Sequence, residues 1–168
     1  MQMKMKLAVI SAAVILAACG KKEEAPAPAP APAAAPAAPE NLVVKIGHVG
    51  PTSGAIAHLG KDNENGAKMA IEELNAAGVM IGGKPAKFEL LAEDDAGDPK
   101  QGTAAAQKLV DAKVNGVIGH LNSGTTIPAS ALYSEAGLPQ ISPSATNPKY
   151  TRQGFKTTFR MVADDVHL

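Results

Sequence analysis

The chain has 168 residues, and its 16 basic and 16 acidic side chains give a formal net charge of zero. It has no Trp, two Tyr and three Phe, and no basic patch with interleaved aromatic residues, so the sequence argues against a nucleic-acid partner. Its single cysteine, Cys19, excludes a disulfide within the chain, and its four histidines stand at no spacing typical of a zinc site.

Residues 1–19 are typical of a bacterial export signal. Two lysines precede Leu7–Ala18, an apolar segment shorter than the about 20 residues that span a bilayer. The segment ends in Leu16-Ala17-Ala18-Cys19, which resembles the lipobox of lipoproteins. We therefore expect Cys19 to carry a lipid anchor that holds the protein on a membrane, in the periplasm or at the outer cell surface. An ordinary secretory signal is the alternative.

Residues 20–41 are expected to be a tether between this anchor and the folded part. Ala25–Pro39 consists only of alanine and proline, and its six prolines prevent a regular helix. Such a segment is a semi-stiff spacer that can extend about 3.1 Å per residue.

From Leu42 onward, segments typical of strands and helices alternate, with turn residues between them. Strands are predicted over Leu42–Val49, Lys87–Ala92, Val114–Ile118, Leu138–Ser142 and Phe155–Val162. Helices are predicted over Asp62–Ala77, from the Asp98 cap to Ala112, and through Ala131, Leu132 and Ala136. This alternation predicts an α/β fold, with a doubly wound parallel sheet flanked by helices.

Three turns rich in hydroxyl groups follow predicted strands: Thr52-Ser53, Ser123–Thr126 and Ser144–Thr146. Ligands of doubly wound sheets bind outside the carboxyl ends of the strands, so these turns are expected to meet. The middle turn opens a helix, whose first N–H groups attract anions, and Ser123, Thr125 and Thr126 add hydroxyl donors. We interpret it as a cradle for a carboxylate. A plain capped helix start is the alternative.

Other chemistry is weakly indicated. The carboxylates of Glu93, Asp94, Asp95 and Asp98 could hold a divalent cation, but a helix cap at Asp98 and a solvated strand end explain them more simply, so no metal site is expected. Ser123 and His120 could form a hydrolase pair, yet no G-x-S-x-G motif surrounds them, and no catalytic residue is expected. The sequence has no phosphate-binding glycine motif and indicates no cofactor.

Three segments resemble the branched-chain (Leu/Ile/Val-type) amino acid binding proteins, which are type I periplasmic substrate-binding proteins of ABC transporters. They are residues 94–101, residues 117–123 and residues 141–146. The resemblance implies that Ser123 and Thr146 hold the α-carboxylate of an amino acid, and that the carbonyl of Ser144 accepts from its α-ammonium group. Leu59 stands where family members often have an aromatic wall for the ligand's side chain.

The resemblance further implies that the protein captures an amino acid, with a branched-chain one expected, and delivers it to an ABC transporter permease. Members of the family have two lobes that close by a hinge. Residues 42–168 would be the first lobe, with the second absent from a truncated sequence. A receptor of the same fold, which senses an amino acid or small amide without transport, is the alternative.

Overall fold

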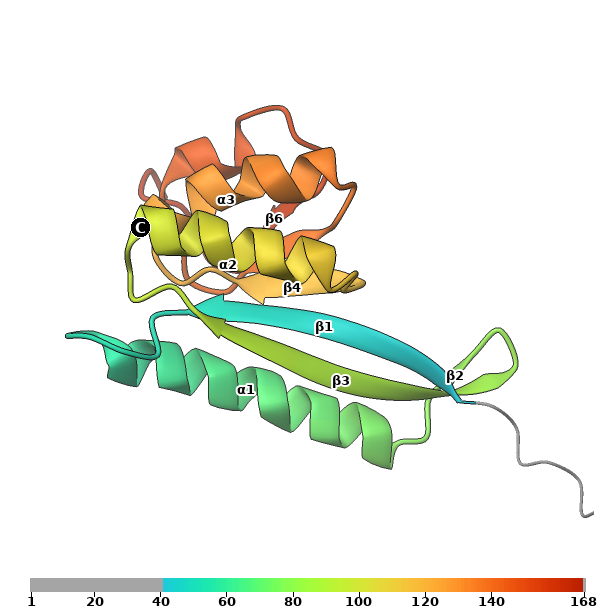
Figure 1. The fold of residues 1–168 in the computed structure, drawn as a ribbon. Helices are drawn as coiled ribbons and strands as arrows, with labels where there is room; N and C mark the ends of the chain where they lie inside the picture. The colour runs from blue at the N-terminus through green and yellow to red at the C-terminus, as the bar shows by residue number, and fades with distance from the viewer. Residues whose placement is uncertain (1–40, 168) are drawn as a thin grey trace, which may run out of the picture. The chain divides into compact units, whose positions relative to one another are not determined.

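The structure, a computed structural model, describes residues 41–167 (Figure 1). The expected export signal with Cys19 lies outside the described residues, and so does the expected tether apart from Asn41. Among the helices of residues 41–167, none combines the length and the apolar character needed to cross a membrane.

Strands and helices alternate along the described part of the chain. The strands are β1 (Leu42–Gly50), β2 (Met80–Ile81), β3 (Lys84–Asp94), β4 (Gly116–Gly119), β5 (Gln140–Ser142) and β6 (Thr158–Arg160). The helices are α1 (Ala57–Ala76), α2 (Pro99–Asp111), α3 (Ser123–Glu135) and the short 3-10 helix η1 (Pro148–Thr151). Every predicted strand and helix is present, although several bounds differ.

The sheet has the strand order β2-β3-β1-β4-β5-β6. β1 pairs in parallel with β3 and β4, and β4-β5 and β5-β6 are also parallel. The predicted α/β fold with a parallel sheet is therefore confirmed. Only β2, which was not predicted, is antiparallel to its neighbour. Gly82 and Gly83, both with positive φ, form the two-residue turn that this hairpin requires.

Helices cover both faces of the sheet, with α1 against β1 and β3 on one face and α2 and α3 on the other (Figure 1). The main core lies under α2 and α3 and includes Leu109, Val117 and Tyr133. A Cβ on Gly47 of β1 would come within 2.6 Å of Leu109 Cδ1, so the glycine allows α2 to pack closely on the strand.

α1 begins at Ala57, five residues before the predicted start at Asp62. Gly60 explains the difference, because a Cβ there would lie 2.2 Å from the carbonyl oxygen of Pro51. A glycine in a helix normally argues for a boundary, but here it permits close contact between α1 and the turn after β1.

The strand order places a topological switch point between β1 and β4. The chain leaves β1 through α1 to reach β3 on one side, and reaches β4 through α2 on the other. The connections therefore lie on opposite faces of the sheet, and the loops after β1 and β4 diverge. In open α/β sheets the resulting crevice is where ligands bind.

Candidate functional site

The three hydroxyl-bearing turns lie at the carboxyl ends of β1, β4 and β5. Two hydrogen bonds join the later turns to helices: the N–H of Asn147 donates to Ser123 Oγ over 3.1 Å, and Asn63 Nδ2 donates to Ser144 Oγ over 3.0 Å. Because Asn63 belongs to α1 and Ser123 begins α3, these contacts bring both helices to the turn after β5.

Ser123 is the first residue of α3 and is half-buried. The first backbone N–H groups of this helix that donate to a carbonyl are those of Thr125 and Thr126, and both donate to the carbonyl of Asn122. The N–H groups of Ser123 and Gly124 precede them, at the positive end of the helix dipole. Because the Ser123 oxygen accepts from Asn147, the hydroxyl proton remains available for a further acceptor.

The expectation that Thr125 and Thr126 offer hydroxyl donors is wrong. Both residues are fully buried. Thr125 Oγ1 donates to the carbonyl of Asn122 over 3.1 Å, and Thr126 Oγ1 lies 2.8 Å from the same carbonyl and 3.1 Å from that of His120. Threonine hydroxyls near a helix start commonly bond back to preceding carbonyls. Of the three hydroxyl residues, Ser123 alone is not fully buried.

Ser144 and Thr146 lie in the turn that follows β5, and both are half-buried. The hydroxyl of Ser142 organises this turn by accepting from the N–H of Ala145 over 2.9 Å. The carbonyl of Thr146 accepts from the N–H of Asp165 over 2.9 Å. The hydroxyl and the N–H of Thr146 have no hydrogen-bond partner among residues 41–167. The turn therefore has hydrogen-bond donors available for a ligand.

Leu59 lies in the first turn of α1 and is 43% exposed, so it does not belong to the core. It stands one helical turn before Asn63, which contacts Ser144. Asn63 and Asn147 were not singled out from the sequence. The i, i+4 spacing between Leu59 and Asn63 could have placed Asn63 on the same helix face as Leu59. No local sequence pattern indicates the contact of Asn147 with Ser123.

The acidic residues at the end of β3 and shortly after it each have a partner within the protein. Asp94 Oδ1 accepts from the N–H groups of Thr52, Ser53 and Ala96 at 2.8, 3.3 and 2.9 Å. Although burial raises the pKa of Asp94, these bonds lower it below its ordinary value. Glu93 pairs with Lys108, and Asp98 caps α2. Within residues 41–167, no three His, Cys, Asp or Glu side chains group as ligands of a metal.

The structure does not bring His120 and Ser123 together as a hydrolase pair. His120 is fully buried, with Nδ1 2.9 Å from Asp95 Oδ2 and Nε2 3.1 Å from the hydroxyl of Tyr133. Burial lowers the pKa of His120, and the bond to Asp95 does not reverse that direction. Both ring nitrogens are thus engaged away from the Ser123 hydroxyl, and the geometry lacks the base that a serine nucleophile needs.

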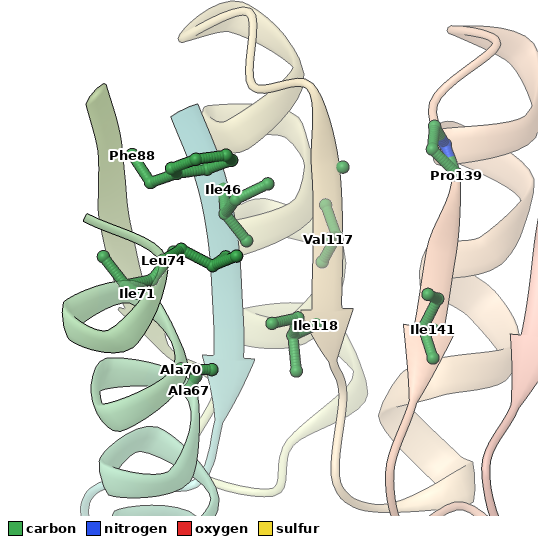
Figure 2. A pocket seen from close by; sticks show the side chains of 11 residues that line it. Ile46, Ala67, Ala70, Ile71, Leu74, Phe88, Val117, Ile118, Pro139 and Ile141 are labelled. Atoms are coloured by element: carbon green, nitrogen blue, oxygen red, sulfur yellow. The ribbon is translucent and has the colours of Figure 1, made fainter. Parts of the chain in front are cut away.

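An apolar groove of about 250 Å³ lies elsewhere, between α1 and the sheet (Figure 2). Its walls include Leu74 and Phe88 on one side and Ile118 and Ile141 on the other. None of the residues that line it carries a polar or charged side chain, and none belongs to the three turns. The groove therefore cannot recognise the charged ends of a zwitterion.

The chain is similar in sequence to known proteins. The model of the family described as periplasmic binding protein matches residues 43–166. The chain is 47% identical over 115 residues to "Leu/Ile/Val-binding protein homolog 1" of Brucella abortus, an alignment that covers 68% of this chain and 30% of that protein. It is 43% identical over 122 residues to the "Leucine-specific-binding protein" of Salmonella typhimurium, which covers 73% of this chain and 32% of that protein.

Solved structures show the same fold. The isoleucine complex of the branched-chain amino acid transporter substrate binding protein LivJ from Streptococcus pneumoniae superposes with a TM-score of 0.67 at 35% identity, over 73% of this chain and 34% of that chain. A Rhodopseudomonas palustris solute binding protein in complex with 3,4-dihydroxy benzoic acid gives a TM-score of 0.63 at 28% identity, over 73% of this chain and 32% of that chain.

The chain spans about a third of the length of the curated relatives that it matches. The matched residues nevertheless contain the described sheet except for Leu42, together with the three turns at its carboxyl edge. This chain belongs to the periplasmic binding protein family.

Proposed function

We propose that this chain forms the amino-acid-binding lobe of an extracytoplasmic solute-binding protein, which captures a branched-chain amino acid and passes it to an ABC transporter permease. One observation carries the proposal: the hydroxyl of Ser123, at the start of α3, has its oxygen held by Asn147 and its proton without an acceptor among residues 41–167. Such a donor beside two open helix N–H groups suits a carboxylate.

The proposed roles follow from the polarity of each group. Ser123 and Thr146 donate to the α-carboxylate, and the carbonyl of Ser144 accepts from the α-ammonium group. Leu59, which is 43% exposed in the first turn of α1, forms the apolar wall for the ligand's side chain. The names of the relatives support a ligand of the leucine, isoleucine and valine type.

The domain arrangement is part of the proposal. Residues 42–168 would be one lobe of a two-lobed protein, because the relatives are about three times as long as the aligned region. Residues 20–41 would be the tether and Cys19 the lipidated residue after a signal over residues 1–19, which would hold the protein on the outer side of a membrane.

A second ligand class has support from one comparison. The Rhodopseudomonas palustris relative in complex with 3,4-dihydroxy benzoic acid shares the fold, and that ligand offers a carboxylate without an ammonium group. A sensing receptor that binds an amino acid or a small amide without transport would use the same contacts. Whether binding requires the α-ammonium group distinguishes an amino acid ligand from a hydroxybenzoate.

A thermal-shift panel tests the proposal on the complete protein without residues 1–19, with the common amino acids, small amides and hydroxybenzoates as probes. A ligand at a thousand times its Kd stabilises the folded state by about 4 kcal/mol, which raises the melting temperature by several degrees. A shift confined to leucine, isoleucine and valine supports the proposed ligand. A shift with hydroxybenzoates alone supports the second class, and no shift with any probe contradicts the proposal.

A further inference from the structure

Three buried titratable side chains form a hydrogen-bonded chain that the proposed ligand contacts do not use. Asp95 follows β3, His120 follows β4 and Tyr133 lies in the last turn of α3, and each is fully buried. His120 lies between the other two, 2.9 Å from Asp95 and 3.1 Å from Tyr133. We call these three residues the buried triad.

The protons of the buried triad have one consistent arrangement. Burial lowers the pKa of His120 and raises that of Tyr133, so the imidazole is neutral and the phenol keeps its proton. Burial alone would raise the pKa of Asp95, but hydrogen bonds from His120 and the N–H of Gly97 outweigh it and lower the pKa. The Tyr133 hydroxyl therefore donates to Nε2, and Nδ1–H donates to the Asp95 carboxylate.

The backbone of His120 connects the buried triad to the proposed site. Its carbonyl accepts from Ser142 Oγ over 2.7 Å, and it lies 3.1 Å from Thr126 Oγ1, in the first turn of α3, which shares its proton with the carbonyl of Asn122. Ser142 in turn accepts from the N–H of Ala145, in the turn that holds Ser144 and Thr146. One residue thus links the helix start that bears Ser123 to the turn after β5.

A third connection joins the buried triad to the carboxyl end of β1, which is an interior strand of the sheet. The N–H of Asp95 donates to the carbonyl of Gly50 over 3.2 Å, at the end of β1. Rotation of the His120 ring is opposed from both sides, because a turn away from either partner would leave a buried polar group unpaired. The buried triad therefore fixes the His120 backbone relative to β1, β4 and α3.

From these contacts we infer that Asp95, His120 and Tyr133 are positioning residues of the ligand site, which hold Ser123 and the Ser144–Thr146 turn at a fixed separation. The inference rests on the proposed function, since it concerns the residues proposed to bind the amino acid. The His120 ring is fully buried, so it acts through the backbone and not by touching the ligand.

The test is Tyr133→Phe in the complete protein, which removes one hydroxyl and keeps the ring. Ser130→Ala is the matched control: it removes another fully buried hydroxyl from the same helix, whose partners are the Ile127 carbonyl and Gln153. Calorimetric titration with L-leucine, at a temperature where all proteins are folded, should show affinity falling about three- to tenfold for Tyr133→Phe and staying unchanged for Ser130→Ala. Equal affinities in the two variants would overturn the inference.

Amide hydrogen exchange supplies a readout that needs no ligand. The N–H of Asn147 reports its bond to Ser123, and its exchange should quicken in Tyr133→Phe but not in Ser130→Ala. Unchanged exchange in Tyr133→Phe counts against the positioning role. Wild-type protein that binds neither L-leucine nor any other amino acid would refute the proposed function, while the exchange of Asn147 would still decide the inference.

Discussion

The N–H of Asn147 donates to the hydroxyl oxygen of Ser123 across 24 positions of the chain. This bond orients the serine hydroxyl without consuming its proton, because a hydroxyl can accept and donate at once. It also ties the start of α3 to the turn after β5, where Ser144 and Thr146 lie. The bond therefore holds together the two turns that carry the proposed ligand contacts.

The first prediction concerns Ser123. In the complete protein, Ser123→Ala should weaken binding of the amino acid by about tenfold or more, since a hydrogen bond to a charged carboxylate contributes about 1.5–3 kcal/mol. Ser134→Ala, at the far end of the same helix, is the control and should leave the affinity unchanged. Calorimetric titration measures both. An unchanged Kd for Ser123→Ala would exclude the carboxylate role.

Much of the fold could be predicted from the sequence, because the local signals agree with the tertiary structure. Asp98 and Pro99 begin α2 as predicted, and the Asp98 carboxylate accepts from the N–H groups of Lys100 and Gln101. The start of α1 and the two-residue strand β2 could not be predicted as readily. The first depends on contact of Gly60 with a distant turn, and the second is too short to show a hydrophobic pattern.

The site was less accessible to sequence reasoning than the fold. The alternation of elements places the three turns at one edge, but nothing in the order of residues says which hydroxyl of residues 123–126 faces outward. Thr125 and Thr126 are buried because α2 packs against that side of α3, and a Cβ on Gly102 would lie 3.0 Å from the Cβ of Thr125. The buried triad likewise joins residues from three separate segments.

The second prediction concerns ligand choice. Leu59 is 43% exposed, so Leu59→Ala should change the free energy of unfolding by no more than about 0.5 kcal/mol. It should weaken binding of leucine more than that of alanine, because it removes apolar surface from the proposed wall. Met69→Ala, at a 60% exposed position of the same helix, should alter neither affinity. Equal losses for both ligands would show that Leu59 does not face the ligand's side chain.

The third prediction concerns pH. Burial lowers the pKa of both His48 and His120 in the folded protein, whereas in the unfolded chain each takes up a proton below about pH 6.5. The unfolded state then binds more protons than the folded state, so the free energy of unfolding should fall as the pH decreases below about 6.5. Each histidine contributes a fall of up to about 1.4 kcal/mol for each pH unit. Asp95, whose folded pKa is lowered, adds a loss of the same sign below about pH 4.

Urea denaturation at pH 5, 6, 7 and 8 checks this dependence. His58 is exposed on α1, and His58→Gln serves as a control that should keep the wild-type slope. A free energy of unfolding that stays constant from pH 7 to pH 5 would show that neither buried histidine resists protonation in the folded state.

The fourth prediction compares two glycines of α1. A Cβ at Gly60 would lie 2.2 Å from the carbonyl oxygen of Pro51, whereas one at Gly66 meets nothing within 4 Å. Gly60→Ala should therefore force α1 away from the turn after β1, destabilise the protein by about 1–3 kcal/mol and displace Leu59 and Asn63 from the site. Gly66→Ala should instead stabilise it by about 0.5–1 kcal/mol, because alanine is the better helix former. Thermal unfolding measures the stabilities, and calorimetric titration with L-leucine measures the affinities. If both variants gain stability and keep their affinity, close contact between Gly60 and Pro51 is not what positions α1 at the site.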